Sequence, residues 1–90
     1  AASDVYKRQE HGGRSHRAST QVEITRRLNR ARDFIHAEAH RRLVLADIAD
    51  VACLSPHHFH RLFTTAFRAS PGVYVTELRL ERAARRIATT

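Results

Sequence analysis

The stretch Leu45–Phe63, LADIADVACLSPHHFHRLF, decides the fold because its spacing predicts two short helices joined by a tight turn. Apolar residues recur at helical spacing on one face of the first helix: Leu45, Ile48, Ala49 and Ala52. We expect Ala49 where the two helices cross, because a side chain larger than a methyl group would force them apart. After the turn come Leu54, an apolar plug, and Ser55-Pro56, an N-cap followed by proline at the first helical position. A second helix therefore begins at Pro56.

This second helix separates apolar from polar side chains. Its apolar stripe, expected to face the core, consists of Phe59, Leu62, Phe63, Ala66 and Phe67. The opposite face carries hydrogen-bonding and cationic groups and no carboxylate: His57, His60, Arg61, Thr64 and Arg68. For a single amphipathic helix, an ordinary solvated face is a sufficient explanation. Together with the preceding helix, the small residue at the crossing and the turn, the pattern favours a helix that enters the DNA major groove.

Four segments carry a resemblance to a known family: Phe34–His36, Leu43–Ala49, Cys53–Phe63 and Ser70–Ala83. In their motifs these segments resemble the DNA-binding domain of the AraC/XylS transcription regulators, over about Val22–Ile87. The resemblance implies an all-α fold with two homeodomain-like helix-turn-helix units joined by a long linking helix. Only the first unit and most of the linking helix are expected here, as a truncated small helical bundle over residues 20–90.

The resemblance also implies a function and a set of contacts. The function is sequence-specific binding of double-stranded DNA within a bacterial transcription regulator, with residues 56–67 as the recognition helix. Carried over by position, the base-contacting residues are His57, His60 and Arg61, and the phosphate-contacting residues are Ser55, Thr64 and Thr65. No cofactor is implied. In the full-length protein, the family pattern adds an effector ligand bound by a companion domain and a contact with RNA polymerase.

Two positions depart from the usual helix-turn-helix pattern. Cys53 occupies the turn position that glycine usually holds, where a positive φ costs a non-glycine residue about 1 kcal/mol. Val44 stands where a serine or threonine would cap the first helix, which weakens that helix start by about 1 kcal/mol. Asp47 in the first turn partly offsets this loss through the helix dipole.

Composition bounds the class of protein. The chain has 90 residues, with 16 Lys and Arg against 9 Asp and Glu, which gives a net charge of +7 with neutral histidines. Such a balance suits a polyanionic partner, although a helical protein-interaction module with a basic face would share it. The single cysteine excludes an internal disulfide and fits a reducing cytoplasm. No apolar run is long enough to span a bilayer, so no membrane partner is expected.

Seven histidines raise the hypothesis of a metal-binding module. His57 and His60 could share an ion on one helix face, and His36 and His40 have i, i+4 spacing, but no further ligand completes either set. We therefore expect histidines that face solvent or DNA, and no metal site. Cys53 lacks the neighbouring residues that would activate a thiol. Since no phosphate loop or paired carboxylates occur either, an enzyme is not expected.

The flanking segments complete the organisation. Residues 1–19 have no helical or strand periodicity, and we expect them to be disordered. Within them, Ser3–Gln9 resembles a translated sequencing adaptor. The alternative is that this N-terminal segment is a basic arm that contacts DNA. A supporting helix is predicted to start at a capping box, Thr20–Glu23, and to end near Ala39. Its apolar stripe is Ile24, Leu28, Ala31 and Ile35. A last helix starts at Ser70-Pro71, and its apolar surface comprises Tyr74, Leu78, Leu80, Ala84 and Ile87, the far end having nothing obvious to pack on. Its Arg79 and Arg82 are expected to contribute only general attraction to DNA.

Overall fold

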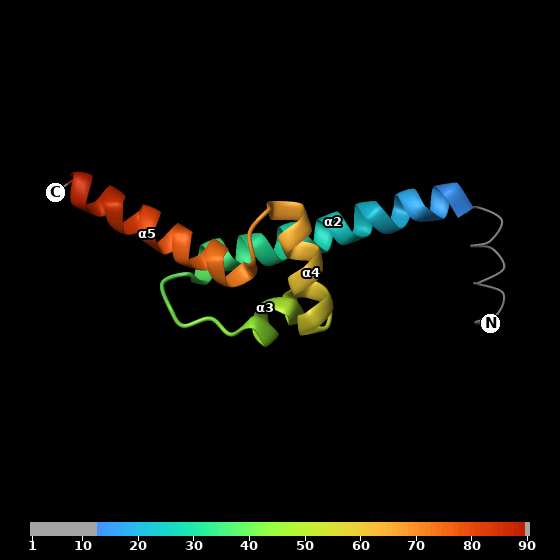
Figure 1. Ribbon diagram of the computed structural model, residues 1–90, viewed down its shortest axis with the longest axis horizontal. Helices are drawn as coiled ribbons and strands as arrows, with labels where there is room; N and C mark the ends of the chain where they lie inside the picture. Colours follow the sequence, from blue (N-terminus) through green and yellow to red (C-terminus); the bar gives the residue numbers. More distant parts are fainter. Residues whose placement is uncertain (1–12, 90) are drawn as a thin grey trace.

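A computed structural model describes residues 13–89 of the chain, and the side chains of residues 19–88 within that range. These residues form a small all-α fold whose helices are α2 (Gly13–Glu38), α3 (Leu45–Val51), α4 (Pro56–Phe67) and α5 (Pro71–Thr89). Figure 1 shows α2 and α5 extending in opposite directions, with α3 and α4 beside their junction. The all-α helix-turn-helix class predicted from the sequence is confirmed. Within residues 13–89, no helix has the length and apolar character needed to cross a membrane.

The core lies where α2, α3 and α4 meet, and α5 closes one side of it. Its buried residues are Leu28, Ala31, Ile35, Ile48, Ala49, Ala52, Phe59, Phe63 and Val75. Ala49 is completely buried, as expected of a residue at a close helix crossing. The aromatic residues are stacked along α4, with the ring of Phe63 5.3 Å from Phe59, 4.5 Å from Phe67 and 5.4 Å from Tyr74 of α5, measured between centroids. Phe63 therefore joins the recognition-helix candidate to α5.

The start of the supporting helix was predicted wrongly. Because α2 already runs from Gly13, the capping box predicted at Thr20–Glu23 lies inside the helix. Glu23 instead accepts hydrogen bonds from Arg26 and Arg27, at 2.9 and 3.2 Å, one turn further along. Such i, i+3 and i, i+4 pairs stabilise a helix interior, and the sequence pattern of a capping box does not distinguish the two uses. Residues 13–19, predicted to be disordered, are thus helical. The predictions for Ser3–Gln9 and the rest of residues 1–12 lie outside the described residues.

The turn between α3 and α4 has the predicted backbone geometry. Cys53 has a φ of 58°, in the left-handed region that favours glycine. Val44 precedes α3 and makes no side-chain capping hydrogen bond, as expected. Ser55 caps α4, its hydroxyl oxygen accepting a hydrogen bond from the backbone N–H of His58 at 3.3 Å. Leu54 packs partly buried against the core, which confirms its assignment as an apolar plug.

Helix α5 begins as predicted, with the Ser70 hydroxyl oxygen accepting a hydrogen bond from Val73 N–H at 3.2 Å. Its packing differs in part from the predicted stripe. Val75 of α5 is buried in the core and was not in that stripe, while Tyr74 and Leu78 pack partly buried against the core. The later members of the stripe, Leu80, Ala84 and Ile87, are exposed, so the apolar stripe of α5 packs on the core only over its first half. Ala66 of α4, also predicted to face the core, is exposed as well.

Candidate nucleic-acid interface

The surface of α4 separates apolar from polar residues as the sequence predicted. Phe59 and Phe63 are completely buried, whereas the three predicted base-contacting residues, His57, His60 and Arg61, are exposed. Since α4 is attached to the core by one stripe, its opposite face is accessible along the helix. His60 and Arg61 follow His57 by three and four positions, about one helical turn, so the helix brings all three side chains to one accessible surface.

The three residues predicted to contact phosphates differ in the hydrogen bonds that their hydroxyl groups already make within the protein. Ser55 only accepts a hydrogen bond, so its own O–H can still be donated. Thr64 and Thr65 instead donate their hydroxyls to the carbonyl oxygens of His60 and Arg61, at 2.7 and 3.0 Å. A hydroxyl has one proton to donate, so either threonine would have to give up its bond within the helix before donating to a phosphate. Ser55 is therefore the best placed of the three.

The charge of this surface is positive on α4 and negative on α3. No acidic residue occurs between Asp50 and Glu77, so α4 carries no carboxylate that would repel phosphates. On α3, however, Asp47 and Asp50 are exposed. A polyanion is therefore attracted to α4 and repelled from the exposed side of α3, which restricts how the helix-turn-helix unit can approach it.

Arg68, predicted on the polar face of α4, lies at the end of the helix instead. It has a φ of 59° and forms the C-cap, its backbone N–H donating to the Thr64 carbonyl oxygen at 2.8 Å. A non-glycine residue in this conformation terminates the helix and redirects the chain towards α5. Its side chain is exposed, but its position is not that of a helical residue one turn beyond Thr64.

Arg79 and Arg82 have a role that the sequence did not indicate. Arg79 donates to the carbonyl oxygens of Ala39, at 2.9 Å, and Arg41, at 2.6 Å, while Arg82 donates to that of His36 at 2.6 Å. The last carbonyl groups of a helix lack partners within it, and Arg82 satisfies one of these in the last turn of α2, while Arg79 binds two carbonyl groups in the segment that follows the helix. These bonds give both arginines a structural role, and their contribution of general attraction to DNA stays a prediction. The bonds join residues about 40 positions apart, a separation at which local patterns carry no signal.

The fold brings no third ligand to either of the histidine pairs considered as metal ligands. Among the described residues, no group of three or more histidine, cysteine, aspartate or glutamate side chains is placed to hold a metal ion. His36 forms a hydrogen bond with the Tyr74 hydroxyl at 2.7 Å, and His40 lies beyond the end of α2, so the two do not share a helix face. Cys53 is exposed in the turn.

Comparisons with known proteins gave no significant match to a family model, a curated protein or a solved structure. The functional assignment therefore depends on the geometry of the chain itself and on the sequence resemblance.

Proposed function

We propose that this chain binds double-stranded DNA by placing α4 in the major groove, as part of a bacterial transcription regulator of the AraC type. The observation that carries the proposal is the combination of a buried aromatic stripe and an exposed, carboxylate-free polar face on one helix that follows a capped tight turn. A helix of this kind is the usual reading element of helix-turn-helix proteins, and the major groove is wide enough to admit it.

The three exposed side chains suit different contacts. The planar fork of Arg61 can donate two hydrogen bonds to O6 and N7 of guanine, which makes it the best candidate for reading a base. His57 and His60 each offer ring nitrogens that donate or accept according to tautomer. Ser55, at the start of α4, can donate its hydroxyl to a phosphate, where the helix N-terminus also favours negative charge.

The proposal is tested by comparing Arg61→Ala with a matched change, Arg30→Ala, on the exposed surface of α2. Both variants lose one positive charge, but only the first alters α4. Fluorescence anisotropy should be measured on a duplex selected from a random library and on a duplex of random sequence, at low salt because a single module binds weakly. We expect Arg61→Ala to lose about 1 to 3 kcal/mol on the selected duplex and much less on the random one. Arg30→Ala should weaken both equally.

An equal loss by Arg61→Ala on both duplexes would assign Arg61 to a phosphate and leave His57 and His60 as the residues that read sequence. The alternative function is a basic helical module that binds an acidic protein partner. A second titration, with polyglutamate, distinguishes it from DNA binding. Equal affinity for polyglutamate and duplex DNA, with the same dependence on salt, would refute DNA binding as the function.

A further inference from the structure

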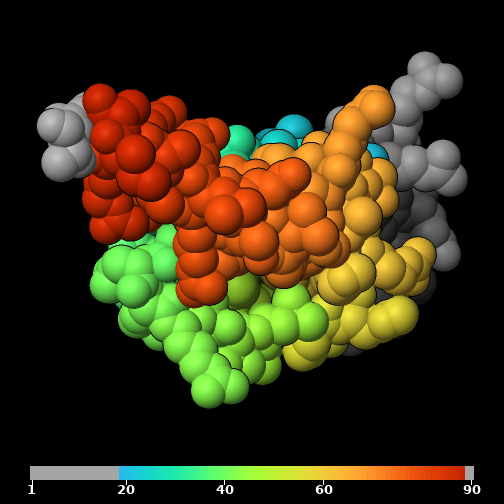
Figure 2. Space-filling view, turned by 60° about the vertical axis from the view of Figure 1, so that its left-hand side comes forward, coloured from blue at the N-terminus to red at the C-terminus, as the bar shows by residue number. Residues whose placement is uncertain are grey.

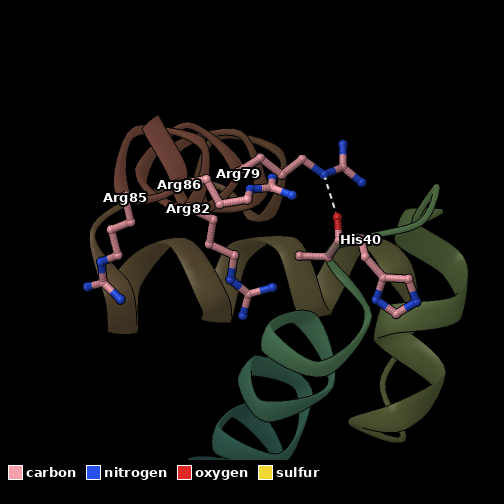
Figure 3. A pocket seen from close by; sticks show the side chains of 6 residues that line it. His40, Arg79, Arg82, Arg85 and Arg86 are labelled. Carbon is pink, nitrogen blue, oxygen red and sulfur yellow. Dashed lines mark hydrogen bonds between the residues drawn. The ribbon is translucent and has the colours of Figure 1, made fainter. Parts of the chain in front are cut away.

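A basic cleft lies where α5 passes the end of α2, away from the exposed face of α4. Its volume is about 380 Å³, and its lining residues are Ala39, His40, Arg79, Arg82, Arg85 and Arg86. Figure 3 shows the arginines arising from successive turns of α5, with Arg79 hydrogen-bonded to Ala39 and with Arg82 and Arg85 extending to the same side of the helix. The volume falls in the range of small-molecule sites.

The cleft concentrates positive charge because no acidic residue lines it. Of the nearby carboxylates, Glu38 pairs outside the cleft with Arg41 at 2.6 Å, whereas Glu81 pairs with Arg85, a lining residue, at 3.0 Å. The cleft holds four guanidinium groups and the Glu81 pair compensates one charge at most, so the remaining positive charges repel one another and an anion between them would reduce that repulsion. This arrangement favours a ligand with more than one negative charge.

Two of the arginines are already held in place. Arg79 and Arg82 are positioned by their bonds to the carbonyl oxygens of Ala39, Arg41 and His36, so the conformational entropy of these side chains is lost on folding and not on binding. A guanidinium group has five N–H donors, of which Arg79 uses two and Arg82 uses one in these bonds. Each therefore retains its charge and further donors for a ligand.

We propose that this arginine cleft binds a phosphate group. A terminal phosphate group presents three oxygens and up to two negative charges, and successive phosphodiesters of a nucleic acid present one charge each, so either fits several guanidinium forks better than a single carboxylate does. Two sources share this chemistry, the backbone of a DNA duplex and a free phosphorylated compound. The proposal is independent of the role of α4, because it concerns a different surface and can be tested without DNA.

The test is a titration of the 90-residue chain with inorganic pyrophosphate at constant ionic strength, followed by the NMR signals of the arginine side-chain Nε–H groups. We expect saturable shifts of Arg79 and Arg82. The double variant Arg85→Gln/Arg86→Gln, which spares the bonds to α2, should bind about tenfold more weakly or worse. The control Arg26→Gln/Arg30→Gln removes the same charge from α2 and should stay within about twofold of the parent.

Absence of saturation, or an equal loss in the two double variants, would overturn the proposal. If the cleft variant failed to fold, the titration of the parent chain would still test the site. Saturable shifts confined to residues outside the cleft would then refute it. A second arm repeats both variants on a duplex of random sequence. Weaker duplex binding by the cleft variant alone would support the site and assign the DNA backbone as its ligand, and unchanged duplex binding with weaker pyrophosphate binding would support a free phosphorylated compound.

Discussion

Replacing Phe63 by alanine should remove the main link between the recognition-helix candidate and the rest of the fold. The Phe63 side chain is completely buried, and its ring contacts those of Phe59, Phe67 and Tyr74. A buried phenylalanine truncated to alanine costs about 3 to 5 kcal/mol, through lost burial and the cavity left behind. We expect the upper part of this range, because three aromatic contacts are lost together and each contributes roughly 0.5 to 1.5 kcal/mol beyond burial.

The expected loss is large compared with the stability of so small a domain. A domain of this size has a free energy of unfolding of roughly 4 to 12 kcal/mol. For a domain of 60 to 100 residues, each 1 kcal/mol lost from the free energy of unfolding lowers the thermal midpoint Tm by about 4 to 8 °C. Phe63→Ala should therefore lower Tm by at least about 12 °C or leave the chain unfolded at room temperature. Thermal melts followed by far-ultraviolet circular dichroism measure this shift.

The matched control is Leu80→Ala on α5, a truncation of a large apolar side chain that is 65% exposed. Its effect should stay within about 0.5 kcal/mol. A parent-like melt for Phe63→Ala would refute the reasoning, because it would mean that α4 does not attach to the core through this stripe. A Leu80→Ala variant as unstable as Phe63→Ala would place the core of the fold elsewhere.

Three further predictions concern the ends of the helices. Arg79→Ala should lower the free energy of unfolding by about 1 to 3 kcal/mol, because two carbonyl groups in the segment after α2 lose a charged donor; a urea midpoint equal to that of the parent would contradict this. Cys53→Gly should raise the free energy of unfolding by up to about 1 kcal/mol by relieving the positive φ of 58°, and a lower urea midpoint would count against this reading of the turn. The hydrogen bond from Arg41 holds the pKa of the Glu38 carboxyl below its usual value. The stabilising effect of this bond is therefore present above the unfolded-state pKa of Glu38 and is lost as the pH falls through its folded-state pKa. Over that acidic window Tm should fall less in Glu38→Gln than in the parent, and parallel pH profiles would exclude the effect.

The candidate interface was largely predictable from the sequence, since each of its features is local. Helical periodicity alone distinguishes the buried Phe59 and Phe63 from the exposed His57 and Arg61, because side chains three and four positions apart share a helix face. The serine-proline pair at Ser55 likewise marks a helix start through contacts within one turn. The same local reasoning failed for Glu23, where one pattern of polar residues serves either a helix start or a helix interior.

The arginine cleft could not be predicted because it depends on how α5 crosses α2. Figure 2 shows the orange-red middle part of α5 against the green segment that follows α2, a contact between parts of the chain that are far apart in sequence. Val75 is likewise buried only because α5 packs on the core, and the periodicity of α5 did not select it over Leu80. Before the helices are placed, both residues are equally suitable as apolar positions.

The amino-acid sequence by itself determined the helical class, the turn at Cys53 and the polar face of α4, because spacing along one helix specifies which side chains share a face. Only the tertiary structure decided how far α2 extends, which apolar residues of α5 are covered and where the guanidinium groups of Arg79 and Arg82 find their partners. The physical reason is that hydrogen bonds and burial between distant segments depend on how the helices pack, and a lone arginine gives no sign of which carbonyl groups it will meet.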